Sequence, residues 1–120
     1  MRATDQRVSE GCIFCKIAAG KIPVERIAEN EELLAFPDID PQAPVHVLII
    51  PKKHVTSLKE VSDWGLIGRM HQFAVKVAEQ KGIAQSGYRV LINTGLNGVQ
   101  TVLHLHLHLL GGRVMRWPPG

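Results

Sequence analysis

Apolar and polar residues alternate strictly in one part of the chain, residues 102–110, where leucine and histidine follow each other in turn. A period of two is typical of a β-strand, because successive side chains of a strand point to opposite faces. The pattern predicts a strand with His104, His106 and His108 in a row on one face and leucines on the other, core-facing side. Three imidazoles are costly to bury without partners. The histidine face is therefore expected to meet water, a metal, an anion or a substrate.

The pattern in the rest of the chain predicts four more strands and two helices. The strands are expected over residues 24–28, 32–36, 46–51 and 88–93, and a short helix over residues 11–19. The long helix is expected to begin at Ser62 and to end at Gly82. Its apolar stripe follows helical spacing: Leu66, Met70, Phe73, Ala74 and Val77. Together the elements predict an α+β fold, a five-stranded antiparallel sheet with the long helix on one face.

Composition narrows the class of protein. The chain has 120 residues, of which 45% are hydrophobic, and a formal net charge of +3. Residues 1–10 are polar and aperiodic, so we expect a disordered leader followed by a single domain over residues 11–120. Residues 52–54 form the one local basic cluster, and no long basic run predicts a nucleic-acid partner. No secretory segment or membrane span is recognisable, which predicts a cytoplasmic protein without membrane contact.

Two groups of residues carry candidate chemistry. Neighbouring histidines on a strand can ligate a catalytic metal, or they can form a metal-free nucleophile and phosphate site. In the second case His106 is the best-placed nucleophile, since a histidine on either side can hold phosphate oxygens. Cys12 and Cys15 can be two small core residues, a redox pair or half of a zinc site that needs two more ligands.

Several segments together resemble one known family. The sequence from His104 to Leu110 fits the His-φ-His-φ-His-φ-φ motif of the histidine triad superfamily, in which φ is apolar. Residues 35–39, 41–46, 50–54 and 111–113 and the ending Trp-Pro-Pro-Gly are similar to segments of its small nucleotide-binding proteins. The Cys-Ile-Phe-Cys start is similar to that of bacterial members. The resemblance runs from about Cys12 to the C-terminus.

The resemblance implies a catalytic assignment. It implies a hydrolase that cleaves purine nucleoside 5′-phosphoramidates, or related nucleotidyl bonds, through a nucleotidyl-histidine intermediate. His106 would be the nucleophile, and Thr101 would assist the leaving group. His108 would donate to phosphate oxygens, with His104 and His46 completing the catalytic set.

The resemblance also implies a purine-nucleotide site. Phe14, Ile22 and Phe36 would enclose the base, and Asp38 with Ile39 would bind the ribose. The remaining nucleotide contacts would come from Asn93, Gln100, Thr101, His106, His108 and Trp117. Asp38 has a simpler explanation as the cap of a proline-rich loop.

A structural zinc ion and a two-fold dimer are further implications of the resemblance. Zinc would be held by Cys12, Cys15, His54 and His104. Two sheets would join into ten strands in a homodimer, with the C-terminal tail reaching the partner's site. No redox cofactor is implied.

Two positions depart from the family pattern. Val99 stands where the family usually has glycine, and valine resists a positive φ and close ligand approach. Pro37 replaces a frequent histidine beside the base. Val99 favours one alternative, a nucleotide-binding regulatory or scaffold protein with little turnover. A metal hydrolase built on the three strand histidines is the other.

Overall fold

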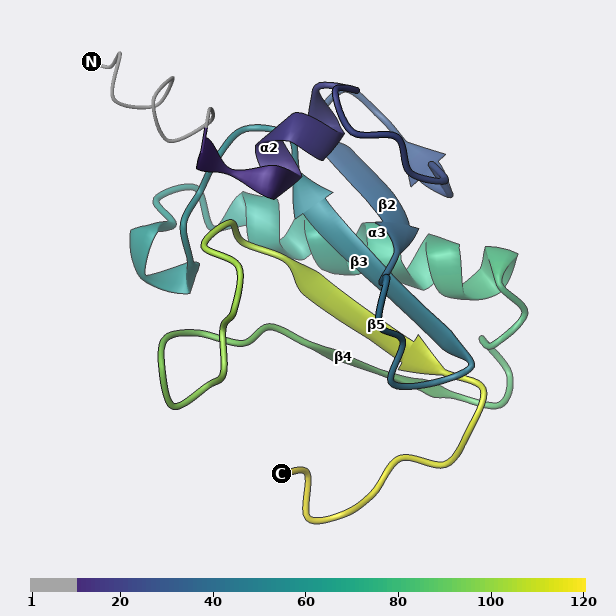
Figure 1. Ribbon diagram of the computed structural model, residues 1–120. Coiled ribbons are helices and arrows are strands. Elements are labelled where there is room, and N and C mark those ends of the chain that lie inside the picture. The colour runs from purple at the N-terminus through teal and green to yellow at the C-terminus, as the bar shows by residue number, and fades with distance from the viewer. Residues whose placement is uncertain (1–10) are drawn as a thin grey trace.

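The sheet is the centre of the fold. The computed structural model describes residues 11–120, so the leader expected over residues 1–10 lies outside the described residues. The strands are β1 (Ala28–Glu29), β2 (Leu33–Pro37), β3 (Val45–Pro51), β4 (Tyr88–Leu91) and β5 (Leu107–Gly111). All neighbours are antiparallel and their order is β1-β2-β3-β5-β4 (Figure 1). The predicted α+β fold with a five-stranded antiparallel sheet is confirmed.

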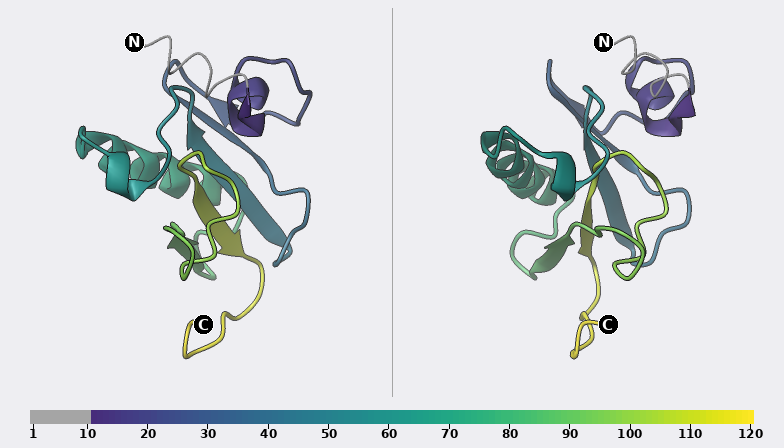
Figure 2. Two further views of the ribbon diagram at one scale, coloured as in Figure 1. Left: turned by 60° about the vertical axis from the view of Figure 1, so that its left-hand side comes forward. Right: turned by 90° about the vertical axis from the view of Figure 1, so that its left-hand side faces the viewer.

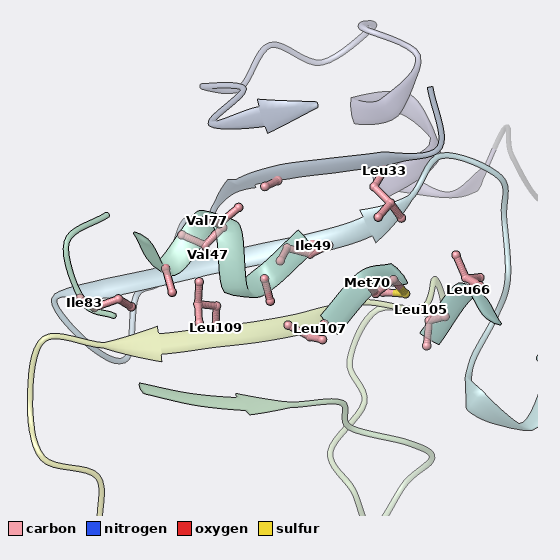
Figure 3. Close-up of a cluster of buried hydrophobic side chains, with 13 residues drawn as sticks. Leu33, Val47, Ile49, Leu66, Met70, Val77, Ile83, Leu105, Leu107 and Leu109 are labelled. Carbon is pink, nitrogen blue, oxygen red and sulfur yellow. The ribbon is translucent and has the colours of Figure 1, made fainter. Parts of the chain in front are cut away.

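Helices cover both faces of the sheet, as the two turned views show (Figure 2). The long helix α3 (Gly65–Gln80) lies on one face, and the short helix α2 (Ile13–Ala18) lies on the other. A single 3₁₀ turn, Leu58–Glu60, precedes α3. Because successive strand side chains point to opposite faces of the sheet, they form two separate hydrophobic cores. One core faces α3 and contains Leu33, Ala35, Val47, Ile49, Leu105, Leu107 and Leu109 (Figure 3). The other lies under α2 and contains Leu34, Phe36, Leu48 and Ile50.

The helix α3 has the predicted stripe and a different start. Leu66, Met70, Ala74 and Val77 are buried against the sheet, with Phe73 partly buried beside them. Ser62 is not the N-cap, so that prediction is wrong. Trp64 occupies the cap position without a side-chain bond, and Asp63 Oδ1 accepts from the Gly65 amide at 3.0 Å. Within residues 11–120, no helix combines the length and hydrophobicity needed to cross a bilayer.

The histidine strand is shorter than predicted. Strand β5 begins at Leu107, whereas the alternation predicted a strand from residue 102. Leu103 is 64% exposed, so it does not join the core with the other leucines. The predicted strand 24–28 is wrong except at its last residue, because β1 spans only Ala28–Glu29. A side-chain repeat therefore extends further along this chain than the strand pairing does.

Candidate functional site

Residues 100–106, which include His104 and His106, pair with no strand of the described sheet. The loop 51–56 holds them through its carbonyl oxygens. The three bonds run from His104 Nε2 to Pro51 (2.8 Å), from the Leu105 amide to Val55 (2.6 Å) and from Gln100 Nε2 to Thr56 (2.8 Å). They take the place of a β-ladder over this stretch. The histidines before β5 are therefore positioned by this loop and by their own side-chain contacts.

His106 has one ring nitrogen fixed and one left for chemistry. Its Nδ1 lies 2.7 Å from the carbonyl oxygen of His104. Because a carbonyl oxygen only accepts, Nδ1 carries the proton and Nε2 keeps its lone pair. Burial lowers the pKa of His106, which favours the neutral ring. His106 is 5% exposed, and its ring is nearly perpendicular to the Phe14 ring, with 5.1 Å between ring centroids. This is the protonation pattern that a histidine nucleophile needs.

His46 and His108 form a hydrogen-bonded pair beside it. The main-chain amide of Gln42 donates to His46 Nδ1 at 3.0 Å, so the proton of neutral His46 is on Nε2. His46 Nε2 then donates to His108 Nδ1 at 2.8 Å. Burial lowers the pKa of His46 and lowers that of His108 to about 4. Neutral His108 therefore carries its proton on Nε2, a buried atom with no hydrogen-bond partner among the described residues.

Asp38 lies next to this pair. Its Oδ2 is 3.3 Å from His46 Nε2, and its Oδ1 accepts from the Asp40 amide at 2.8 Å. The second bond caps the proline-rich loop, as the simpler explanation of this residue expected. The neighbouring Ile39 side chain is fully exposed. One carboxylate thus connects the loop to the histidine pair.

A second cluster has the donor set of a zinc site. The ligand atoms of Cys12, Cys15, His54 and His104 all lie within 4.8 Å of one another. Nδ1 of His104 is 3.2 Å from Cys12 Sγ and 3.4 Å from Cys15 Sγ, and Nδ1 of His54 is 3.3 Å from Cys15 Sγ. Tetrahedral zinc, with bonds of about 2.0–2.3 Å, holds its ligands roughly 3.3–3.8 Å apart.

The tautomer of His104 fits this metal as well. Its Nε2 donates to the Pro51 carbonyl, so its Nδ1 lone pair faces the two sulfurs. Burial lowers the pKa of His104 to about 4, which keeps that lone pair free of a proton at neutral pH. Cysteine and histidine in a closed Cys₂His₂ set are the ligands of structural zinc sites. The quartet implied by the resemblance is thus brought together in space.

A third set, Asp38 with His46 and His108, is equally tight but does not fit a metal. Its ligand atoms also lie within 4.8 Å of one another. The amide of Gln42 occupies the His46 Nδ1 lone pair, which forces the proton onto the Nε2 atom that would have to bind the ion. His104 points into the cysteine cluster, so the three triad histidines do not converge on one ion. The geometry gives no support to the His₃ metal hydrolase.

The turn before the histidines is tightly bonded and carries one strained residue. The amides of Val99 and Gln100 donate to the carbonyls of Leu96 and Gly95, both at 3.0 Å. Val99 adopts φ +60°, which a β-branched residue rarely does. The Gln100 side chain bonds main-chain groups with both its donor and its acceptor. Thr101 is exposed at the end of this turn.

The other nucleotide-binding candidates occupy different environments. Phe14 and Phe36 are buried and meet edge to face at 5.6 Å, whereas Ile22 is half-buried. Asn93 is half-buried and follows the last pair of β4 with β5. Trp117 is 81% exposed, with its ring 6.0 Å from Arg89 Cζ. Of these, only Phe14 contacts the triad through a ring interaction that the structure records.

Two contacts of the site were not predicted from the sequence. One is the Gln42 amide on His46, and the other is Arg113, whose guanidinium binds the Gln42 carbonyl. Both involve main-chain atoms, which every residue has, so no residue type marks them. Gln42 and Arg113 lie in two segments of the family resemblance, residues 41–46 and 111–113, but the resemblance gave neither residue a role.

Comparison with known proteins decides the family. A family model described as the HIT domain matches residues 19–115, well over half of the chain. The chain belongs to the HIT domain family. This confirms the resemblance to histidine triad proteins, and the site described above contains the motif that gives the family its name.

Similar proteins and solved structures agree with the assignment to the HIT family. The chain is 48% identical to the 14 kDa zinc-binding protein of Zea mays, over 90% of this chain and 87% of that protein. It is 46% identical to Adenylylsulfatase HINT1 of Arabidopsis thaliana, over 90% of this chain and 76% of that protein. Among solved structures, the HIT family hydrolase of Legionella pneumophila Philadelphia 1 matches with a TM-score of 0.88 and 50% identity, over 91% of this chain and 99% of that one. These similarities support a hydrolase of the HIT family.

Proposed function

We propose that this HIT protein hydrolyses purine nucleoside 5′-phosphoramidates, or related nucleotidyl bonds, through a covalent nucleotidyl–His106 intermediate. The observation that carries the proposal is that one ring nitrogen of the site has a free lone pair and another has a free N–H group. His106 Nε2 keeps a lone pair because Nδ1 is bonded to the His104 carbonyl, and His108 Nε2–H is a donor without a partner. A nucleophile and a donor for phosphate oxygens thus come from adjacent positions of one face.

The reaction has two steps. The His106 Nε2 lone pair attacks the α-phosphorus, and the phosphorus–nitrogen bond breaks, with the departing amine taking up a proton from solvent. Water then attacks phosphorus and gives a proton back to solvent, and the phosphorus–Nε2 bond breaks to release the 5′-monophosphate and restore the neutral imidazole. His108 Nε2–H stabilises the charge that develops on a non-bridging oxygen in both steps. The Thr101 hydroxyl, exposed three residues before His104, would assist the leaving group.

The nucleoside would be held next to the histidine pair. Asp38 accepts from the ribose hydroxyls while it stays near His46, and exposed Ile39 lies against the sugar. The Phe14 ring packs nearly perpendicular to the His106 ring, so it helps to orient the nucleophile. With half-buried Ile22 and with Phe36, it would form the wall on which the base rests. Asn93 and Gln100 support the phosphate side, Gln100 by bonding its own turn.

Zinc is proposed for the Cys₂His₂ cluster, where it would act as a structural ion. Cys12, Cys15, His54 and His104 would hold it, and all four of its positions would be filled by protein. The zinc-binding relative supports this assignment. The chemistry at phosphorus then depends on the histidines of the triad alone.

The test is turnover of a fluorogenic adenosine phosphoramidate by wild type and by His106→Ala. We expect the variant to lose turnover by at least about a thousandfold, because the step through the intermediate is lost. Its AMP affinity should change only a few-fold, since the ring bonds to phosphorus only along the reaction path. Turnover of the variant within a few-fold of wild type would rule out the nucleophile. Adenylyl sulfate belongs in the same assay, because a relative is named as an adenylylsulfatase.

One observation favours a second function, nucleotide binding with little turnover. Val99 holds a positive φ in the turn beside the site, where glycine would be unstrained. AMP binding by wild type together with negligible hydrolysis of every nucleotidyl substrate tried would favour this alternative.

A further inference from the structure

A hydrogen-bonded chain leads from the histidine pair to an arginine outside the site. His108 receives its tautomer from His46. The Gln42 amide occupies the Nδ1 lone pair of His46, and Asp38 Oδ2, 3.3 Å from Nε2, supports the same tautomer. Gln42 itself lies in the irregular loop between β2 and β3, where no sheet partner holds it. Whatever fixes Gln42 therefore affects which nitrogen of His108 carries the proton.

Arg113 fixes Gln42 from the other side. Its Nη2 and Nε donate to the Gln42 carbonyl at 2.9 Å and 3.3 Å, and its Nη1 donates to the Val114 carbonyl at 3.0 Å. The third bond ties the guanidinium to its own chain, so the fork cannot turn freely. Gln42 is thus held at its carbonyl by Arg113 while its amide holds His46.

The chain reaches this position only because of Gly112. After β5 the chain passes beside the loop that leads into β3 (Figure 1). Gly112 has φ +89°, and a Cβ there would lie 2.9 Å from Pro44 Cβ. A side chain would push the exit segment away from the loop and move Arg113 away from Gln42. The approach of the two segments is therefore part of the same arrangement.

We propose that Arg113 is a positioning residue of the site: by holding Gln42 it fixes the tautomer of His46 and so makes His108 present an N–H group to a bound phosphate oxygen. The tautomer part stands on the described contacts alone, and the phosphate part rests on the proposed function. A lone pair at His108 Nε2 would repel a phosphate oxygen, whereas the N–H group binds it. Arg113 touches neither substrate nor nucleophile in this scheme.

The test compares Arg113→Met with Arg116→Met in the full-length, zinc-loaded chain. Both changes remove one guanidinium from the exit segment, but Arg116 makes no recorded bond to Gln42. Long-range ¹H–¹⁵N NMR spectra report which ring nitrogen of His46 and His108 is protonated. We expect mixed tautomers at both rings in Arg113→Met and wild-type spectra in Arg116→Met. Unchanged tautomers in Arg113→Met would overturn the proposal.

Kinetics provide the second readout. With the adenosine phosphoramidate, kcat of Arg113→Met should fall about tenfold while KM stays within about threefold, because only transition-state donation is weakened. Arg113→Lys, which can donate a single bond, should recover part of kcat. Equal kcat values for the Arg113→Met and Arg116→Met variants would overturn the catalytic part.

A third variant addresses the approach of the segments. Gly112→Ala keeps the guanidinium but displaces it, so it should reproduce the mixed tautomers. Normal tautomers in Gly112→Ala together with an altered particle mass in Arg113→Met would assign Arg113 to assembly and overturn the proposal. If wild type shows no turnover while Arg113→Met still scrambles the tautomers, the proposed function fails and the positioning role of Arg113 stands.

Discussion

At the scale of single residues, main-chain groups decide what each histidine can do. The His104 carbonyl keeps the proton of His106 on Nδ1, and the Gln42 amide places the proton of His46 on Nε2. A histidine motif supplies the rings, but the peptide groups around them select the tautomers. One lone pair and one N–H group then face the site from adjacent triad positions.

The buried state of His108 predicts a pH dependence of stability. Its folded pKa is lowered to about 4 by burial, whereas the free side chain titrates near 6.5. At pH values between these two, His108 is protonated in the unfolded chain and neutral in the folded protein. The free energy of unfolding should therefore fall as the pH drops from 6.5 towards 4, by up to about 3 kcal/mol from this group. Urea unfolding at several pH values measures it.

The matched variant for this prediction is His108→Gln. It should be less stable than wild type at pH 7, because the bond from His46 is altered, and its stability should depend less on pH below 6.5. His104 is common to both proteins, so the difference between the two curves reports His108. Parallel curves would contradict the origin assigned here.

The strain at Val99 predicts a stabilising substitution. A left-handed conformation costs an ordinary residue roughly 1–2 kcal/mol, and glycine pays no such cost but loses more chain entropy. Val99→Gly should therefore raise the free energy of unfolding by about 0.5–1 kcal/mol. Val114→Gly is the control, since Val114 is also exposed and has no positive φ. Equal changes in the two variants, measured by urea unfolding, would show that Val99 stores no strain.

At the scale of elements, the segment with the three histidines, residues 104–108, is held by different partners in its two halves. Leu107 and the residues after it pair with β3 and β4, whereas His104 to His106 rely on the loop 51–56 and the cysteine cluster. Helix α2 and its N-cap residue supply the two cysteines of that cluster from the face opposite α3. A zinc ion there would connect α2, the loop and the segment that carries the proposed nucleophile.

Loss of the metal ligands should therefore loosen this segment. Cys12→Ser is expected to abolish zinc binding and to lower stability by more than the roughly 0.5–1.5 kcal/mol typical of a buried Ile→Val change. Hydrogen exchange of the Leu105 amide, which donates to Val55, should accelerate. Ile50→Val is the control, because Ile50 lies in the same core without a ligand atom. Wild-type zinc content in Cys12→Ser, measured by mass spectrometry, would contradict the assignment.

The sequence predicted which helices and strands are present better than it predicted the residues at which they begin and end. The period of two placed Leu105, Leu107 and Leu109 in the core, but it could not report that no strand pairs with residues 102–106. Side-chain repeats record which face is buried, whereas strand ends depend on hydrogen-bond partners far away in the chain. The start of α3 was misplaced for a related reason, since the Asp63 side chain and not Ser62 bonds the first amide.

The candidate site was predictable in part. The residue pattern alone singled out the three triad histidines, and the complete quartet came only through the family resemblance. Cys12 and His104 are 92 residues apart, and no spacing rule joins them. The link from Arg113 to Gln42 carries no sequence signal, because its acceptor is a peptide carbonyl.

At the scale of the whole molecule, the β4 edge of the sheet has no strand partner within residues 11–120, and the tail carries exposed apolar side chains. Strand β4 is at the edge of the sheet and its four residues are half-exposed. The C-terminal tail extends away from the sheet below β4 and β5 in Figure 1, with Val114 and Trp117 exposed. Exposed apolar side chains of this size are typical of interfaces. The ten-stranded dimer and the contact of the tail with the partner's nucleotide site remain predictions from the family resemblance.

Removing the last four residues, Trp117–Gly120, tests the role of the tail. The proposed nucleophile His106 lies just before β5 and the proposed donor His108 lies in β5, and residues 117–120 make none of the bonds that hold them. The attack on phosphorus should therefore persist in the truncated chain. If Trp117 lies at the rim of the partner's site, it meets the leaving group, and its loss should change kcat/KM unequally across leaving groups. A buried tryptophan at an interface contributes enough for about tenfold differences.

The wild-type and truncated proteins are assayed with a panel of adenosine phosphoramidates that carry aryl, indole and amino-acid leaving groups. AMP affinity and particle mass are determined in parallel. AMP affinity should move little, because Asp38 and the histidine pair are retained. Trp117→Phe keeps an aromatic ring and should keep most of the wild-type profile. An equal change for every leaving group would show that the tail does not shape the site. A change from dimer to monomer would instead place its role in assembly, since the tail would then stabilise the interface and not select the substrate.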